Sequence, residues 1–537
     1  MGGRWRFAVA MDRLGLAIPL SPALILLLMF VNFSGLTDTL LAASVLPMAM
    51  IGGILVIRPI YLRRAALLAG SVLALAGCTV GPNFERPEPP KVASFVPAGA
   101  APAPASADAQ QIVQGMDIPA RWWTVFHSAE LDTLVAQALA SNPDVASAEA
   151  ALSQARELLY AQRGALLPTV AANVQALRTR TSATLAPTPA NNAQTYTLYT
   201  PQVTVSYTPD VFGGIHREIE GAAARAESQR YQTEAAYLTL TSSVVQAALL
   251  DSSLREQIVA THDIVDVETQ LLGLLKRQHD AGQISGADLA AQETALAQAE
   301  QSLPPLEKQL VQQRDLLAIL GGRFPAEGPS ATVDISGLTL PHQVPAGLPS
   351  SLVERRPDIR AAVANLHAAS AAIGVAVAAR LPAITLSASG GSAAAGLGGL
   401  ASSPNLFWQV AGEVAQPIFD GGQLKHQQKA AEAAYDQARE QYRSTVLQAF
   451  QNVADAMQAL QLDGEALNAA VLAETSAARS LEISKTQVQL GEVSAISVLN
   501  AEQAYHQARI ALIQAQAARY SDTVALFQAL GAGGWPA

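Results

Sequence analysis

The chain has 537 residues, of which 50% are hydrophobic and 15% charged, and its formal net charge is -10. This length can supply a large core, while the acidic balance argues against a nucleic-acid partner. The single cysteine, Cys78, excludes an intrachain disulfide framework and a cysteine-based metal cage.

The first 61 residues form an apolar N-terminal extension. Leu14–Val31 and Leu40–Ile57 are each long enough to be membrane helices. Phe33–Ile57 resembles a transmembrane piece of an RND-type pump. Membrane spans ahead of a signal peptide make little mechanical sense, so we interpret residues 1–61 as a misassigned start or a remnant of a neighbouring pump gene.

Residues 62–77 have the features of a secretory signal peptide. Arg63-Arg64 precedes a short apolar run, and the small residues Ala76-Gly77 stand directly before Cys78. This pattern resembles a bacterial lipobox, which implies that the Cys78 thiol receives a diacylglycerol and becomes the mature N-terminus. The alternative is an ordinary buried thiol. An Asp directly after the cysteine resembles a signal for retention in the inner membrane. Thr79 stands at that position here, which favours the outer membrane.

Residues 78–120 are predicted to be the lipidated N-terminus and a tether. Pro82–Ala107 is rich in Pro and Ala, which is typical of an extended linker. Folding is expected to begin near Arg121-Trp122-Trp123.

The rest of the chain is predicted to be a tandem duplication, with repeats at 121–345 and 346–537. Asn142–Val145 returns as Arg356–Ile359, and Leu167-Pro168 returns as Leu381-Pro382 at the same offset. Further matches follow in the same order, so the chain repeats one structural unit.

Each repeat begins with a helix and two amphipathic strands. The helix starts at a proline in its first turn, Pro143 or Pro357, and ends before Pro168 or Pro382. Apolar and polar residues then alternate with the period of two that indicates strands. The apolar positions include Val170, Ala172, Val174, Val203, Val205, Tyr207, Ile384, Leu386, Ala388, Leu406, Trp408, Val410 and Val414. Loops are expected at about 179–195 and 390–404.

A very long helix and a returning helix complete each repeat. Residues 215–278 and 423–489 lack proline, and each would span on the order of 100 Å as a helix. This length is typical of a coiled-coil tube. The returning helices are expected at 287–320 and 494–530, and Pro304-Pro305 should kink or break the first of them.

The four strands cannot close a barrel within one chain. Amphipathic strands of about ten residues fit a transmembrane β-barrel, and an open sheet edge cannot lie in lipid. Two chains would supply eight strands and a filled interior, whereas three would supply twelve and room for a channel. We therefore expect a homotrimer. The alternative is a sheet in a soluble domain.

Several segments resemble TolC-like outer-membrane efflux lipoproteins, the NodT-type outer-membrane factors of RND tripartite pumps. They are Cys78–Phe84, Arg86-Pro87, Arg121–Trp123 with Phe126, Gly282–Ser285, Arg356–Asp358, Pro417–Gly422 and Gly491–Ser494. The resemblance covers about Cys78 to Gly534. It implies an α+β membrane protein in which a periplasmic α-barrel of long antiparallel helices continues a 12-stranded trimeric barrel.

The resemblance also implies the function and the partners. The chain would be a passive exit duct for drugs or other toxic compounds, lipid-anchored in the outer membrane. It would dock to a periplasmic membrane-fusion adaptor and an inner-membrane RND pump, which supplies the energy. The alternatives are the outer-membrane duct of a type I protein secretion system and a coiled-coil scaffold without a channel.

By resemblance, the periplasmic gate lies near the second Gly-x-x-Ser turn. Ile496 would form an apolar constriction, and Asn500 stands where the family has an aspartate, so a ring of carboxylates is in doubt. The alternative places Ile496 in the core of the helix pair and Asn500 in solvent. The adaptor-docking turns would be Gly282 with Ser285 and Gly491 with Ser494; otherwise these glycines are only helix stops.

We find no pattern that indicates catalysis, a metal site or a cofactor other than the lipid on Cys78. His-Glu-x-x-His, Gly-x-Ser-x-Gly and P-loop sequences do not occur. The histidines are scattered, and His262, His279, His426 and His506 are expected on solvated helix faces. Asp210 and Asp420 are expected to cap the helices that follow them.

Overall fold

The structure is a computed structural model. It describes residues 79–90, 92, 94, 95, 110–114, 116, 118–180, 182, 195–346 and 349–531. The apolar extension, the signal peptide and Cys78 lie outside these residues.

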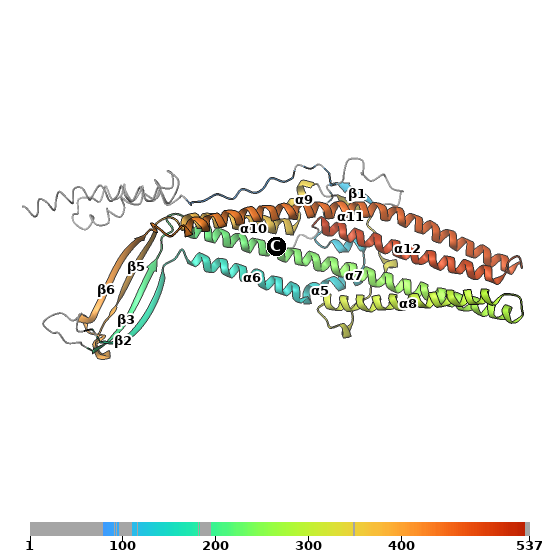
Figure 1. The fold of residues 1–537 in the computed structure, drawn as a ribbon, viewed down its shortest axis with the longest axis horizontal. Helices are drawn as coiled ribbons and strands as arrows, with labels where there is room; N and C mark the ends of the chain where they lie inside the picture. The colour runs from blue at the N-terminus through green and yellow to red at the C-terminus, as the bar shows by residue number, and fades with distance from the viewer. Residues whose placement is uncertain are drawn as a thin grey trace, which may run out of the picture. The chain divides into compact units, whose positions relative to one another are not determined.

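The described residues form a succession of long helices interrupted by two pairs of strands (Figure 1). The helices are α5 (Ala129–Ser141), α6 (Pro143–Gly164), α7 (Gly214–Asp280), α8 (Gly286–Leu320), α9 (Pro349–Arg355), α10 (Pro357–Ala378), α11 (Gln423–Gln489) and α12 (Ala495–Ala529). The strands are β1 (Gln111–Gln114), β2 (Thr169–Arg180), β3 (Thr195–Tyr207), β4 (Gln343–Ala346), β5 (Ala383–Ser392) and β6 (Leu406–Ala415).

The tandem duplication is visible in the helix lengths. Helices α6 and α10 each have 22 residues, α7 and α11 each have 67, and α8 and α12 each have 35. Pro143 and Pro357 begin their helices as predicted, because proline needs no partner for a backbone N–H in the first turn.

The predicted caps at Asp210 and Asp420 are present. The Asp210 carboxylate accepts from the backbone N–H groups of Ile215 (3.0 Å) and His216 (2.7 Å). The Asp420 carboxylate accepts from Gly422 and Leu424, each at 2.8 Å, and these hydrogen bonds lower its pKa. Each aspartate therefore satisfies backbone donors at the start of a 67-residue helix.

The chain divides into two units. A sheet unit contains the described residues before Arg86 together with Ala155–Arg225 and Asn365–Arg439, and a helical unit contains the remainder. In the sheet unit, β2, β3, β5 and β6 lie side by side in that order, and every neighbouring pair is antiparallel (Figure 1).

Strand β5 extends further than predicted. Gly390 and Gly391 were expected in a loop, yet the strand continues to Ser392. A Cβ on Gly391 would lie 2.3 Å from the Pro201 carbonyl oxygen. The glycine therefore permits a close strand approach rather than marking a turn.

In the helical unit, α8 returns beside α7 and α12 beside α11 (Figure 1). One core cluster centres on Trp122, which is fully buried and stacks on Phe527 with 5.5 Å between ring centroids. A second cluster joins Val344, Leu352 and Ile359 to α11 and α12. Trp122 and Trp123 lie in this core, but β1 (Gln111–Gln114) precedes them, so the folded part of the chain begins earlier than predicted.

Strand β1 was not predicted. It pairs in parallel with β4, so that Gln111 lies opposite Gln343 and Val113 opposite Pro345. Because β1 and β4 have only four residues each and lie far apart in the sequence, neither has a local pattern that would predict their parallel pairing.

Of the two predicted effects of Pro304-Pro305, a break does not occur, since α8 runs through both prolines from Gly286 to Leu320, and a kink stays a prediction. The carbonyls left without helical donors belong to Glu300 and Gln301. Both residues are exposed, so water can satisfy them.

One helix among the described residues, α10, is long and apolar enough to cross a membrane by length and composition. Its apolar residues Ile359 and Leu366 are buried, and Arg360 donates to the Tyr231 hydroxyl at 2.8 Å. We interpret α10 as a helix packed against protein.

Candidate functional site

The first candidate site is the four-stranded sheet, which has one apolar and one mostly polar face. The register places apolar residues of neighbouring strands opposite each other on one side. These are Val170, Ala172, Val174 and Ala176 on β2, Tyr199, Pro201, Val203 and Val205 on β3, Ile384, Leu386 and Ala388 on β5, and Trp408, Val410 and Val414 on β6.

The opposite face carries amides, hydroxyls and one carboxylate. Its polar residues are Thr169, Asn173, Gln175, Gln202, Thr204, Ser206, Thr385, Ser387, Ser389, Gln409 and Glu413. The apolar face is unusually open, since Val174 and Trp408 are each 81% exposed. An exposed apolar face of this kind is typical of a surface that meets a membrane or another protein.

Both outer edges of this sheet lack a partner strand among the described residues. Strand β2 pairs only with β3, and β6 only with β5. Each edge therefore presents a row of backbone N–H and C=O groups that must find partners if the sheet lies in lipid.

The second candidate site is the pair of turns between the long helices and the returning helices. Gly282 and Gly491 both have left-handed backbones, with φ of 73° and 75°. The backbone N–H of the following residue donates in each case to the helix, Gln283 to Gln278 O (2.8 Å) and Glu492 to Gln487 O (2.9 Å). The two turns thus close their helices in the same way.

The serines of the two turns differ. Ser285 forms a capping box with Asp288, because its hydroxyl accepts from the Asp288 N–H while that carboxylate accepts from the Ser285 N–H, each at 3.2 Å. Ser494 is also an N-cap, but its side chain makes no capping hydrogen bond.

The predicted gate residues lie in the first turns of α12. Ile496 is half-buried and packs against Val267 and Leu271 of α7 and Leu499 of α12. Asn500 is exposed. Ile496 therefore contributes to an apolar contact between hairpins within the subunit, and Asn500 is free to face a neighbouring chain or a pore.

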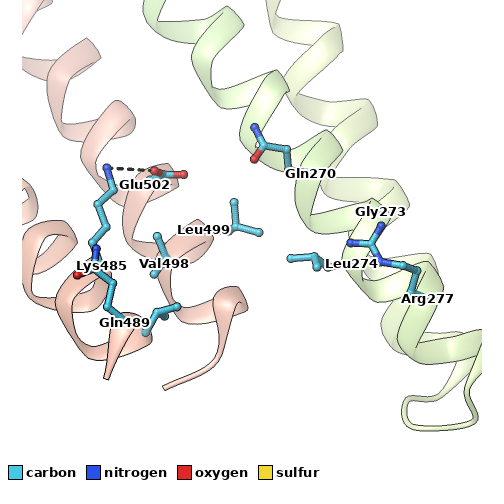
Figure 2. A pocket seen from close by; sticks show the side chains of 10 residues that line it. Gln270, Gly273, Leu274, Arg277, Lys485, Gln489, Val498, Leu499 and Glu502 are labelled. Atoms are coloured by element: carbon cyan, nitrogen blue, oxygen red, sulfur yellow. Dashed lines mark ion pairs between the residues drawn. The ribbon is translucent and has the colours of Figure 1, made fainter. Parts of the chain in front are cut away.

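A cleft of about 660 Å³ opens between α7 and the α11–α12 hairpin near these turns. Figure 2 shows Leu274 and Leu499 facing one another across it. Lys485 and Glu502 form an ion pair of 3.3 Å on one side, and Arg277 extends from α7 on the other. The cleft thus combines an apolar floor with charged walls.

A family model described as "Outer membrane efflux protein" matches residues 134–322 and again 348–532. The chain belongs to the outer membrane efflux protein family.

Members of this family with known names are similar over most of the chain. The pyoverdine export outer membrane protein OpmQ of Pseudomonas putida is 30% identical over 470 residues, which are 87% of this chain and 96% of that protein. The toluene efflux pump outer membrane protein TtgF of Pseudomonas putida is 30% identical over 86% of this chain and 95% of its own.

The solved structure of the outer-membrane channel OprN has a TM-score of 0.74 and 26% identity. The match covers 85% of this chain and 100% of that chain. These findings confirm the predicted family, the α+β fold class with its tandem duplication, the outer-membrane location and the efflux function. The family is one of channels. The repeat boundaries and the individual site residues stay predictions.

The sequence did not predict the charged residues that line the cleft, nor the contact between His506 and Asp263. His506 was expected on a solvated face, but its side chain is only 15% exposed and lies 3.6 Å from Asp263. Burial lowers the pKa of this imidazole despite the neighbouring carboxylates Asp263 and Glu502. A helix of mixed polar residues does not show which of them face another hairpin.

His262, His279 and His426 are exposed as predicted. Within the described residues, no group of three His, Cys, Asp or Glu side chains could hold a metal ion.

Proposed function

We propose that three copies of this chain form a continuous exit duct for small toxic compounds, in which each copy supplies four strands to a barrel of about twelve. One observation carries the proposal: an exposed apolar sheet face ends at two strands, β2 and β6, that have unused hydrogen-bonding edges. Pairing β6 of one subunit with β2 of the next satisfies every edge at once.

The duct works as the outer-membrane part of a tripartite system. Its long helices extend into the periplasm, where a membrane-fusion adaptor and an inner-membrane RND pump complete the path. The turns at Gly282–Ser285 and Gly491–Ser494 are the docking points for the adaptor. Two exposed, similarly shaped helix ends per chain suit a partner that contacts the trimer at repeated positions.

The gate lies at Ile496 and Asn500. Ile496 narrows the duct with an apolar side chain, and its packing against Leu499 and Leu271 couples the constriction to the position of α7. Asn500 contributes an uncharged ring, so the closed gate binds cations less well than a ring of aspartates.

The chain is passive rather than enzymatic, and it uses no cofactor apart from a diacylglycerol on Cys78. The family supplies channels, and energy comes from the pump. The exported compound is a small organic molecule, as suggested by relatives named for pyoverdine export and toluene efflux. The alternative function, the outer-membrane duct of a type I protein secretion system, predicts instead that the protein co-purifies with an ABC exporter.

Disulfide trapping at the strand edges tests this function. Val174→Cys on β2 combined with Val410→Cys on β6, and neighbouring registers of the same face, should produce a covalent trimer under oxidation. The control pair Ala172→Cys with Val203→Cys lies opposite within one subunit and should yield only cross-linked monomers.

Planar-bilayer recording of the same purified protein then tests transport. Discrete conductance steps are expected from a trimeric duct. A cross-linked monomer in every register, or a trimer that conducts no ions even after removal of the Ile496 side chain, would refute the proposal.

A further inference from the structure

The six residues directly after Cys78, the segment Thr79–Phe84, pack against other residues of the sheet unit, which together we call the receptor. The backbone N–H of Val80 donates to Phe212 O at 3.1 Å, between the end of β3 and the start of α7. The Val80 side chain packs with Leu381 and Phe212. The predicted tether was expected to be extended from Pro82 onward, yet Asn83 and Phe84 also make specific contacts.

Arg217 is the centre of this receptor. Its side chain is only 4% exposed. The guanidinium donates to Val80 O (Nε, 3.1 Å), Gly81 O (Nη2, 3.3 Å) and Asn83 Oδ1 (Nη2, 2.9 Å). Its remaining nitrogen, Nη1, donates to Glu220 at 2.7 Å. Only the planar fork of arginine can serve four acceptors spread over this geometry.

Three glycines provide the space for this contact. A Cβ on Gly81 would lie 2.5 Å from Gly374 Cα, and Gly81 has a φ of +90°. A Cβ on Gly374 would lie 2.7 Å from Arg217 Cγ, and one on Gly213 would lie 2.6 Å from Thr79. Segment and receptor therefore meet at backbone distance, which an accidental contact of a loose tether does not require.

The far end of the segment is fixed by an aromatic stack. Phe84 lies on the His367 ring with centroids 4.4 Å apart and planes 13° apart. His367 Nε2 is 2.8 Å from Glu220, the same carboxylate that pairs with Arg217. Burial alone would raise the pKa of Glu220, but the hydrogen bonds from Arg217 and His367 lower it overall, which keeps the carboxylate ionised.

The structure assigns to Arg217 a role beyond helix packing: it is the positioning residue that docks the segment Thr79–Phe84 beside the end of the sheet. Gly81 and Gly374 allow the close approach, and His367 holds Phe84.

Docking determines where a lipid on the preceding residue must lie. Thr79 contacts Gly213, which directly precedes α7 and lies six residues beyond the end of β3. The docked segment therefore begins, at Thr79, next to the point where the sheet meets the helices. Acyl chains on the preceding cysteine would then enter the membrane beside the apolar strand face rather than at the end of a free tether. This consequence rests on the proposed lipidation of Cys78, whereas the docking does not.

Hydrogen exchange of the Val80 amide in the purified trimer tests the docking. Gly81→Ala breaks the contact from the segment side and leaves the receptor unchanged. Arg217→Lys breaks it from the receptor side and keeps the charge. Both variants should exchange the Val80 amide about tenfold faster or more. Arg225→Met, an exposed position on the same helix, is the matched control and should leave exchange unchanged.

A purely structural role for Arg217 makes a different prediction. Arg217→Lys would then lower the melting temperature of the trimer, but Gly81→Ala would leave Val80 exchange at the wild-type rate, and that result overturns the proposal. If Arg217→Lys fails to assemble, Gly81→Ala alone decides, because the subunit body in that variant is unaltered.

Mass spectrometry of Cys78 separates this inference from the proposed lipidation. A protein exported with an ordinary signal peptide in place of residues 1–78 should still protect Val80. Protection without an acyl group on native Cys78 would remove the lipid anchor from the proposed function and leave the docking intact. An acyl group on Cys78 together with an unprotected Val80 amide would support the lipid anchor and refute the docking.

Discussion

Asp522 on α12 forms a hydrogen bond with Asp463 on α11, so two carboxyl groups meet between the helices of one hairpin. Burial, with the hydrogen bond and charge of Asp463, raises the pKa of Asp522 to about 7, although Arg519 opposes the shift. Arg519 itself is buried, with its Nη1 unpaired within the described residues. The folded protein therefore keeps a proton on Asp522 to a higher pH than an exposed aspartate would.

The first prediction concerns the pH dependence of stability. The folded state holds the Asp522 proton more tightly than the unfolded chain, whose aspartates have a pKa near 3.8. This contribution is complete below about pH 4 and is lost as the pH rises toward about 7. Asp522→Asn should flatten the decline in the free energy of unfolding over that window. Denaturant titration at several pH values measures it, with exposed Asp455→Asn as control.

The second prediction uses the duplicated turns as an internal control. Ser285 caps α8 through its side chain, whereas Ser494 makes no such hydrogen bond on α12. Ser285→Ala should therefore cost about 1 kcal/mol of stability, and Ser494→Ala should remain within about 0.5 kcal/mol. Equal losses in chemical denaturation would contradict the assignment of the capping box.

The third prediction tests which face of the sheet meets lipid. Trp408 and Gln409 are adjacent on β6 and point to opposite faces. Trp408→Arg should destabilise the inserted trimer by about 2–4 kcal/mol if the residue lies near the membrane midplane. Gln409→Arg should insert normally and shift ion preference toward anions. Heat-resistant trimer on gels and reversal potentials in bilayers provide the readouts; tolerance of both substitutions argues against a membrane sheet.

The fourth prediction concerns the gate. Ile496→Ala removes bulk at the proposed constriction and should raise single-channel conductance at least about twofold. Asn500→Asp would place three carboxylates around the duct and should increase cation over anion permeability without changing trimer stability. Gln507 is exposed on the same helix and lies outside the proposed ring, so Gln507→Ala is the control. Unchanged conductance in the first variant would place the constriction elsewhere.

Local features of the sequence were sufficient for most elements. Pro143 and Pro357 marked helix starts because proline is favoured in the first turn. The alternation around Val174 and Val410 marked strands because a period of two gives two faces. Residue type was ambiguous at two places. Gly391 indicated a loop but permits close strand packing, and Pro304-Pro305 indicated a kink or a break, of which the break does not occur.

The candidate sites were predicted less completely. The turns at Gly282 and Gly491 were found because a left-handed backbone favours glycine. The partners of Lys485, His506 and Arg217 were not found, since a long polar helix shows no preference for which charged residue will face another hairpin. The proximity of Arg217 to Val80 joins residues 137 positions apart.

The amino-acid sequence alone determined the tandem duplication, the two-faced strands and the need for more strands than one chain supplies, because these depend on periodicity and on unsatisfied backbone groups. Only the tertiary structure decided that β2 and β6 are the open edges, and that the segment after Cys78 is docked rather than free. Both facts arise from contacts between distant residues, where packing and hydrogen-bond geometry outweigh local preference.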